Sequence, residues 1–449
     1  MTNKNNKLFL FLNKNKILLI ILFLVFLFSI IYSFHFKIVP AVDARAYDRI
    51  GLNLAEGNGY REKMEGLLEL DNAIERVGPM YEYFLGSIYY VFGHHYETVW
   101  IAQAVLRTMS ALLIYLITIK IFQDKQSKKK IALVATGIFG FYPDLIEISA
   151  MLMTETFYLF LFCLGLFLFF KYFNKLNIYS AVMLGLIFGL ATLARPPVLF
   201  LIPIIFYYYW QKKNLKYLAV FIITIIIVFI PWTARNYSVY NKIIPFSAAG
   251  GYNFWIGNYH GANGEQESPP EARAYAREYG MAEISKESIK QFKNFVITHP
   301  LEFSKLTLLR INKYFSIIRP MGFWFYQSGI GQAIMLLSSA IVSVILFVFG
   351  LAGVIKSWDQ KNEKLKYLVA FTIITPLIIF ITVVETRYRF QIYPLLSIFA
   401  GYFIVYLWQK EKRWVNKILW IAVAVIFING LADLILSFDR FRERLGWFI

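Results

Sequence analysis

Apolar runs about 20 residues long recur along most of the chain and are separated by polar segments. A helix that crosses the hydrocarbon core of a bilayer needs roughly this length, so each run predicts a transmembrane helix. The shorter runs 178–193 and 197–210 fit either two crossings or one re-entrant pair, which leaves open eleven spans, nine plus that pair, or as many as thirteen. The eleven expected spans are 17–37, 98–122, 131–148, 155–171, 178–193, 197–210, 217–234, 331–355, 366–384, 390–409 and 418–437.

The loops between these spans alternate in their content of lysine and arginine. Loops rich in these residues stay in the cytoplasm, and four lysines precede the first span, whose apolar run is too long for a cleaved signal peptide. We therefore expect a multi-pass protein of the plasma (inner) membrane with a cytoplasmic amino terminus. The other basic loops, all on the same side, are 123–130, 171–177, 211–216, 356–366 and 410–417.

Two polar segments, 38–97 and 235–330, are much longer than ordinary connections, and the charge alternation predicts that both lie outside the cytoplasm. Loops beyond about 12–15 residues usually carry function. Helical patterns at 46–56, 285–297 and 300–315 indicate that both segments are helical. The sequence thus predicts an all-α polytopic membrane protein with an amino-terminal transmembrane module (1–234, including 38–97), a large extracytoplasmic loop (235–330) and carboxy-terminal transmembrane helices (331–449).

The composition excludes a water-soluble enzyme and a disordered chain. Hydrophobic residues make up 58% of the chain and charged residues only 16%, with a mean hydropathy of +0.53, whereas soluble domains carry roughly 25% charged residues. The net charge of +18 would by itself favour a nucleic-acid partner. Much of that charge lies in the cytoplasmic loops, where it orients the helices, so we expect contact with membrane lipid and no nucleic acid. The single cysteine, Cys163, excludes an intrachain disulfide.

The candidate chemistry lies at the outer ends of the spans, where charged residues of both signs gather. Ionisable groups beside membrane spans are functional candidates. A guanidinium binds phosphate oxygens in a bidentate manner, and a carboxylate of suitable pKa accepts the proton of an attacking hydroxyl. These groups suggest a site that holds an anion and performs acid–base chemistry. The residues are Asp43, Asp48, Arg76, Asp144, Glu147, Glu155, Arg195, Arg235, Glu385, Arg387 and Arg389, with Trp255 and Asn258 as candidate sugar or acceptor contacts.

An ordered set of short motifs resembles the GT-C glycosyltransferases that use a polyprenyl-phosphate donor, within them the bacterial relatives of protein O-mannosyltransferases and of the lipid A aminoarabinose transferase. No single motif is specific, and the order, the large first loop and the topology carry the resemblance. The motifs are Asp43-Ala-Arg-Ala-Tyr47, Gly57-Asn-Gly59-Tyr60, Arg76-Val-Gly-Pro79-Met-Tyr81, Met153-Thr154-Glu155, Leu193-Ala-Arg195-Pro196, Pro231-Trp232-Thr-Ala-Arg235-Asn236, Trp255-Ile-Gly257-Asn258 and Glu385-Thr-Arg387-Tyr388-Arg389.

The resemblance implies that a sugar is moved from a polyprenyl phosphate to an acceptor hydroxyl at the outer face of the membrane, with inversion. The acceptor would be a glycan, a lipid or a protein. In that family an Asp in the first loop, matched by Asp43, is the presumed base, and Arg76 occupies the place of a basic residue near the lipid phosphate. We therefore expect Asp43 and Glu155 to be catalytic. The expected substrate and lipid-phosphate contacts are Tyr47, Arg76, Arg195, Arg235, Arg387, Arg389, Trp255 and Asn258.

Three alternatives remain open at this stage. The first is a requirement for a divalent metal, for which the sequence offers no ligand cluster, because Ala44 stands where relatives have a second acidic residue. The adjacent His94 and His95 cannot easily bind one ion together. A glycan polymerase or ligase that transfers a lipid-linked oligosaccharide is the second enzyme hypothesis. A lipid or sugar transporter is less well supported, because transporters have polar sites near the midplane of the membrane and the middle of each span is nearly free of charge here.

Overall fold

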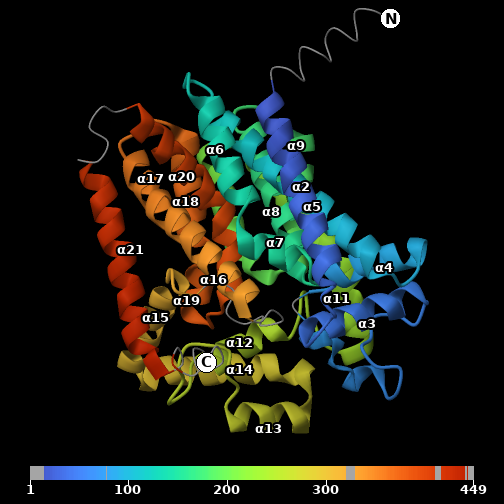
Figure 1. The fold of residues 1–449 in the computed structure, drawn as a ribbon. Coiled ribbons are helices and arrows are strands. Elements are labelled where there is room, and N and C mark those ends of the chain that lie inside the picture. The colour runs from blue at the N-terminus through green and yellow to red at the C-terminus, as the bar shows by residue number, and fades with distance from the viewer. Residues whose placement is uncertain (1–14, 77, 320–328, 410–415, 440–441, 443–449) are drawn as a thin grey trace, which may run out of the picture.

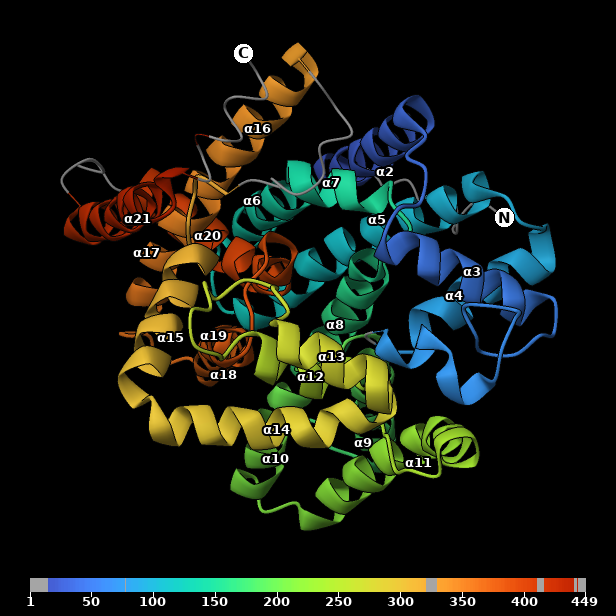
Figure 2. The ribbon, with the colours of Figure 1, turned by 90° about the horizontal axis from the view of Figure 1, so that it is seen from below.

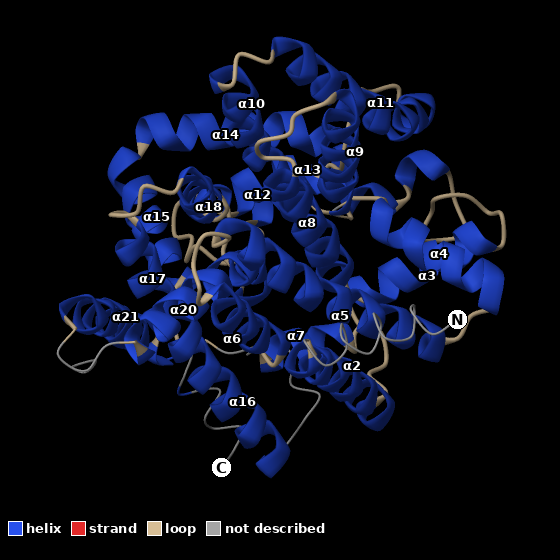
Figure 3. Ribbon diagram, turned by 90° about the horizontal axis from the view of Figure 1, so that it is seen from above, coloured by secondary structure: helices blue, strands red, loops and turns tan. Residues whose placement is uncertain are grey.

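The computed structural model describes residues 15–76, 78–319, 329–409, 416–439 and 442, and every regular element in these ranges is a helix (Figure 3). The predicted all-α polytopic membrane fold is therefore confirmed. Within the described ranges, eight stretches are long and apolar enough to cross a membrane. They are α2 (Lys16–Phe36), α5 (Tyr96–Ile121), α8 (Thr154–Lys171), α11 (Leu215–Tyr240), α16–η4–α17 (Gly329–Val344, Ile345–Phe349 and Gly350–Ser357), α18–α19 (Glu363–Ile374 and Leu377–Ile381), η5–α20 (Thr386–Ile392 and Tyr393–Trp408) and α21 (Lys417–Leu436).

The remaining predicted spans are short or broken, so the expected count of eleven is not confirmed. Helices α6 (Lys128–Gly140) and α7 (Pro143–Ser149) meet at a bend of 55° and would make a ninth span together. Helix α9 (Ile178–Ala194) has only 17 residues, and η3 (Pro196–Leu201) separates it from α10 (Ile202–Gln211). Proline begins both α7 and η3, and its ring and missing N–H disfavour continuation of the preceding helix.

Burial separates the central helices of the bundle from its perimeter (Figure 1). In η5–α20 and α8, 89% and 72% of the most apolar stretch is buried, against 22% in α2 and α11 and 28% in α21. Gly401 allows α20 to pack closely on α6, because a Cβ there would lie 2.7 Å from the carbonyl oxygen of Ile131. The exposed apolar faces of the perimeter helices are those expected to contact lipid.

Both long polar segments lie at one end of the bundle, which we call the loop face (Figure 1). Seen from below, α14 runs across this face, and α3 and α4 lie side by side near its edge (Figure 2). The first segment contains α3 (Asp43–Ala55), η1 (Leu68–Leu70), η2 (Asn72–Glu75) and α4 (Met80–Phe92). The second contains α12 (Ala249–Ile256), α13 (Pro270–Tyr279), α14 (Met281–Thr298) and α15 (Pro300–Tyr314).

Candidate functional site

Asp43, the first residue of α3, is held between two arginines from distant parts of the chain. Nη2 of Arg387 donates to Oδ2 of Asp43 at 2.8 Å, and Nη1 of Arg76 donates to Oδ1 at 3.4 Å. Burial by itself raises the pKa of the Asp43 carboxyl, but the charge and hydrogen bond of Arg387, with the charges of Arg76 and Arg195, lower it below the usual value of 3.8. Asp43 is therefore ionised at neutral pH.

The backbone immediately before Asp43 has an unusual conformation. Val42 has a φ of 49° and a ψ of −117°, in the left-handed half of the map that a β-branched residue rarely adopts. Such a residue costs on the order of 1–3 kcal/mol and is retained where the surrounding structure holds it, often at functional sites. The turn orients the start of α3, and with it Asp43, toward Arg387.

Further carboxylates and arginines surround this pair. Nε of Arg387 lies 3.3 Å from a carboxylate oxygen of Glu385, and burial, together with the charge of Asp43, raises the pKa of Glu385 against the effect of Arg387. Nη1 of Arg195 donates to Oε1 of Glu155 at 2.6 Å, with the Arg195 guanidinium over the ring of Tyr388. Opposite charges thus alternate through the cluster of Asp43, Glu385, Arg387, Arg195 and Glu155, which we call the Asp43 cluster.

The Asp43 cluster does not fit a divalent metal. A hard cation needs carboxylate oxygens that converge on one point, but the guanidinium of Arg387 already lies between Asp43 and Glu385. Within the described ranges, no group of three or more His, Cys, Asp or Glu side chains could hold a metal ion. Of the two adjacent histidines, His94 contacts Asp48 at 2.9 Å, and Asp48 also accepts from the hydroxyls of Tyr89 and Tyr96.

A cavity of about 1070 Å³ adjoins the Asp43 cluster. Glu155, Arg195 and Arg387 contribute to its wall, whereas Asp43, which is bonded to Arg387, does not line it. Much of the remaining wall is apolar, from η3 and α19 and from the segment 243–246. The cavity therefore combines a cationic end with an apolar surface, as a lipid bearing an anionic group would require.

The structure brings some of the predicted residues together and separates others from the Asp43 cluster. Tyr47 is buried one turn after Asp43, with its ring 5.7 Å from that of Tyr81. Arg76 bridges Asp43 and Glu62, which accepts from its Nη2 at 2.8 Å. Arg235 instead donates to the carbonyl oxygen of Tyr60 at 2.7 Å and lies against three aromatic rings. It does not line the cavity.

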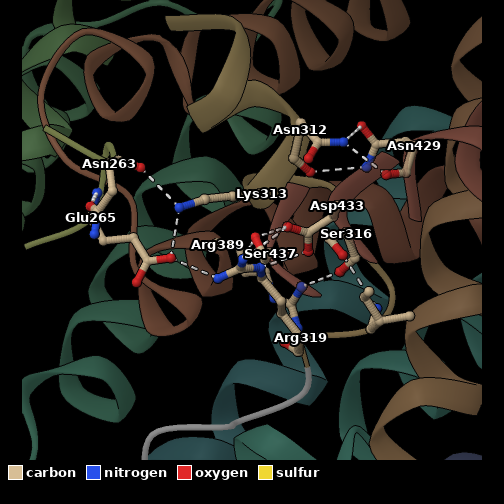
Figure 4. A network of polar contacts seen from close by, with 11 residues as sticks. Asn263, Glu265, Asn312, Lys313, Ser316, Arg319, Arg389, Asn429, Asp433 and Ser437 are labelled. Carbon is tan, nitrogen blue, oxygen red and sulfur yellow. Dashed lines mark hydrogen bonds and ion pairs between the residues drawn. The ribbon is translucent and has the colours of Figure 1, made fainter. Parts of the chain in front are cut away.

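Arg389, two residues after Arg387, belongs to a different cluster. Its Nη1 donates to the carbonyl oxygen of Ser316 at 2.7 Å, and its Nη2 donates to that of Arg319. Arg319 in turn donates to both carboxylate oxygens of Asp433 on α21, at 2.6 and 2.8 Å. Figure 4 shows this network, which we call the Asp433 network. Its other members are Asn263, Glu265, Asn312, Lys313, Asn429 and Ser437.

Trp255 and Asn258 are packed into the loop face and do not line the cavity. Trp255 is buried against the ring of Tyr275. The amide of Asn258 donates to the carbonyl oxygens of Phe254 and Ile381 and accepts from Arg310 at 3.0 Å. This bonding joins α12 to α19 and α15.

Several polar residues of the site were not singled out as binding residues from the sequence. Glu62 is the second partner of Arg76, and Tyr158 and Tyr388 place their rings beside Arg195. The lysines of α14 line the cavity. Their spacing along one helical face is visible in the sequence, but a row of exposed lysines has no specific meaning until a cavity is found beside it.

Comparisons with known proteins agree with this architecture. Residues 76–233 match the family described as dolichyl-phosphate-mannose-protein mannosyltransferase. The oligosaccharyltransferase AglB from Archaeoglobus fulgidus, in complex with an inhibitory peptide and a dolichol-phosphate, has a similar fold, with a TM-score of 0.50 and 13% identity over 95% of this chain and 55% of that one. The Archaeoglobus fulgidus oligosaccharyltransferase in complex with Zn and sulfate is similar with a TM-score of 0.52 and 13% identity, and the match covers 93% of this chain and 53% of that one. No curated protein sequence matches the chain.

These findings confirm the predicted resemblance to GT-C membrane glycosyltransferases and support an enzyme of the glycosyltransferase type. At 13% identity the structural likeness shows the fold alone. The chain spans about half the length of the archaeal enzymes. The family match covers less than half of the chain and includes Arg76, Glu155 and Arg195.

Proposed function

We propose that the protein is an integral membrane glycosyltransferase that moves a sugar from a polyprenyl phosphate to an acceptor hydroxyl at the extracytoplasmic face of the plasma membrane. The observation that carries this proposal is an ionised carboxylate, Asp43, bound to Arg387 at 2.8 Å where that arginine borders an apolar cavity. The combination supplies a base, a cation for a leaving phosphate and a surface for a lipid chain.

In the proposed reaction the acceptor oxygen attacks C1 of the donor sugar from the face opposite the phosphate. The bond between C1 and the phosphate oxygen breaks, and its electron pair leaves with the polyprenyl phosphate. Asp43 takes the proton of the acceptor hydroxyl, and the configuration at C1 is inverted. Arg387 and Arg195 stabilise the negative charge of the phosphate, as preorganised cations do in a site that excludes water.

The bonding of Asp43 suggests how the base becomes available. A carboxylate held by two arginines is a weak base, because its pKa is low. A donor phosphate in the cavity competes for Arg387, and each hydrogen bond that Arg387 transfers to phosphate raises the basicity of Asp43. Glu155, already bonded to Arg195 at 2.6 Å, keeps that second guanidinium oriented, which is its proposed role.

Asp43→Asn tests the assignment, since the amide retains the shape and loses the basicity. In proteoliposomes supplied with a glycosyl polyprenyl phosphate, we expect transfer to fall about 10²–10⁴-fold, the usual contribution of a general base, with the thermal unfolding midpoint little changed. Glu69→Gln is the control, because Glu69 is an exposed carboxylate of the same loop. Full activity of Asp43→Asn would refute Asp43 as the base.

A second candidate is transfer of a whole oligosaccharide from its lipid carrier, which the fold similarity to oligosaccharyltransferases favours. The two candidates differ in the donor and can use the same cavity. Turnover measured side by side with monosaccharide-linked and oligosaccharide-linked polyprenyl donors distinguishes them. Faster turnover of the oligosaccharide donor would replace our first proposal with the second.

A further inference from the structure

Helix α14 carries three lysines along one face at the rim of the cavity. Lys286, Lys290 and Lys293 are spaced i, i+4 and i+7, so they fall within about 60° of one another around the helix axis. All three are exposed and all three line the cavity that also contains Arg195 and Arg387. We call them the α14 lysine row.

The row differs from the other cations of the cavity in its bonding. Arg195 is paired with Glu155, Arg387 with Asp43 and Glu385, and Lys242 with Glu283. Among the described residues, Lys286 and Lys293 have no ion pair, and Lys290 has only a contact of 3.5 Å with Glu287 of the same helix. The row therefore adds positive charge that the protein itself hardly neutralises.

The length of the row indicates the kind of ligand. An α-helix rises 1.5 Å per residue, so about 10 Å separates Lys286 from Lys293 along the axis. One phosphate is bound by one or two such ammonium groups, and holding it with all three would bring three like charges to one point against their mutual repulsion. A chain with a negative charge on successive units can contact all three lysines at once.

We propose that the acceptor of this glycosyltransferase is a polyanionic chain, with phosphate or carboxylate groups on successive units, which lies along the α14 lysine row and delivers a hydroxyl to Asp43. The proposal rests on the proposed function. The donor phosphate then occupies the cavity beside Arg195 and Arg387, and the acceptor enters along α14. Charge complementarity is the recognition principle, and it is sensitive to salt.

The position of the row favours this ligand over the headgroups of the surrounding bilayer. Juxtamembrane lysines that are attracted to the surface of anionic lipid need no cavity beside them. Those of α14 instead line a cavity whose wall also includes Ser247 and Asn253 of the loop face. The same cavity contains the arginines of the Asp43 cluster, so a chain bound at the row shares the cavity with Arg387, the hydrogen-bond partner of the proposed base.

A binding measurement on the full chain in neutral phosphatidylcholine nanodiscs tests the proposal. The probe is a fluorescent poly(glycerol phosphate) oligomer, with dextran of equal length and inorganic phosphate as comparisons. We expect Lys286→Gln/Lys290→Gln/Lys293→Gln to weaken binding of the oligomer by about tenfold or more, since three exposed ion pairs are lost together and each contributes a small favourable amount. Raising the salt concentration should weaken wild-type binding in the same direction.

The control is Lys129→Gln/Lys130→Gln/Lys361→Gln, which removes three exposed lysines from the end of the bundle opposite the loop face and should leave binding unchanged. Equal binding by the α14 variant, or equal binding of dextran, would overturn the proposal. So would an α14 variant that binds the oligomer normally but associates less with phosphatidylglycerol nanodiscs, since the row would then contact bilayer lipid. Binding does not require turnover: Asp43→Asn should bind normally, and a failed transfer assay would refute the proposed function alone.

Discussion

The Asp43 cluster and the Asp433 network use the same pair of functional groups at the same end of the bundle, yet they are built differently. In the first, the Asp43 side chain is 27% exposed, and Arg387 borders the cavity. In the second, the Asp433 side chain is fully buried, and Arg319 binds both of its oxygens (Figure 4).

The difference shows how one chemical pair is open to a ligand in one place and closed to solvent in another. A guanidinium that donates to both oxygens of a buried carboxylate is not expected to exchange that carboxylate for a ligand. Removal of either partner would leave an uncompensated charge in a medium of low dielectric. A pair beside a cavity can exchange one partner for a ligand at much lower cost. Arg387 and Arg389 lie in the same short 3₁₀ segment, η5, and supply one arginine to each arrangement.

Matched substitutions of these two arginines give the largest expected contrast. Arg387→Gln should lower kcat/KM for glycosyl transfer about 10²–10³-fold, the usual effect of removing one preorganised donor, with a much smaller change in Tm. Arg389→Gln should lower Tm strongly, because the carbonyl oxygens of Ser316 and Arg319 lose their buried donor. Transfer by proteoliposomes and thermal unfolding in detergent measure the two effects. The reverse pattern would show that we assigned the two arginines to the wrong roles.

Asp433→Asn examines the buried network from its other side. The substitution removes one of the two carboxylates that Arg319 binds, the other being Glu265 at 2.9 Å, so we expect a loss of up to about 3–5 kcal/mol in the free energy of unfolding. Transfer per folded molecule should stay close to that of the wild type, because Asp433 does not line the cavity. Ser437→Ala, which removes one hydrogen bond from Arg319 and one to Asp433 but no charge, should cost far less. Unchanged stability with lost transfer would extend the reactive site to α21.

Arg76→Gln should shift the acid limb of the pH profile. Arg76 is one of the charges that lower the pKa of Asp43, so its removal should raise that pKa. The base is lost as pH falls through its pKa, so kcat/KM of the wild type should decline only below pH 3.8, and that of the variant at higher pH. Arg49→Gln, on the exposed side of α3, is the control. If the pH profile of Arg76→Gln matches that of the wild type, the acid limb does not report the titration of Asp43.

Lys313→Gln should have the smallest effect, and it concerns alkaline pH. Burial first, and the nearby charge of Arg319 second, lower the pKa of Lys313 to about 8. Between that value and 10.5 the unfolded chain binds more protons than the folded one, so wild-type stability should rise with pH in this window. The variant should lose this rise, a difference of roughly 1 °C in Tm per kcal/mol for a chain of 449 residues. The same slope in both proteins would contradict a charged, buried Lys313.

The sequence by itself determined the class of fold and named many residues of the candidate site. Apolar runs of fixed length define helices wherever water is absent, so the polytopic all-α architecture followed from local composition. Asp43 and Arg387 were both named as candidates from the sequence because charged residues near membrane spans are rare. Their contact was not predictable, since 344 residues separate them, and no local pattern encodes which helix ends meet.

Tertiary structure alone decided which partners each of these charges has. From the sequence, the motif Glu385-Thr-Arg387-Tyr388-Arg389 predicts a single group of substrate-binding side chains. In the structure, the 3₁₀ turn of η5 directs Arg387 toward Asp43 and Arg389 toward Ser316 and Arg319. Likewise, the α14 lysine row became a candidate site only because η3, α19 and α14 enclose a cavity with it. Charge is a property of a residue, whereas its pairing, burial and access to a ligand depend on the elements that pack around it.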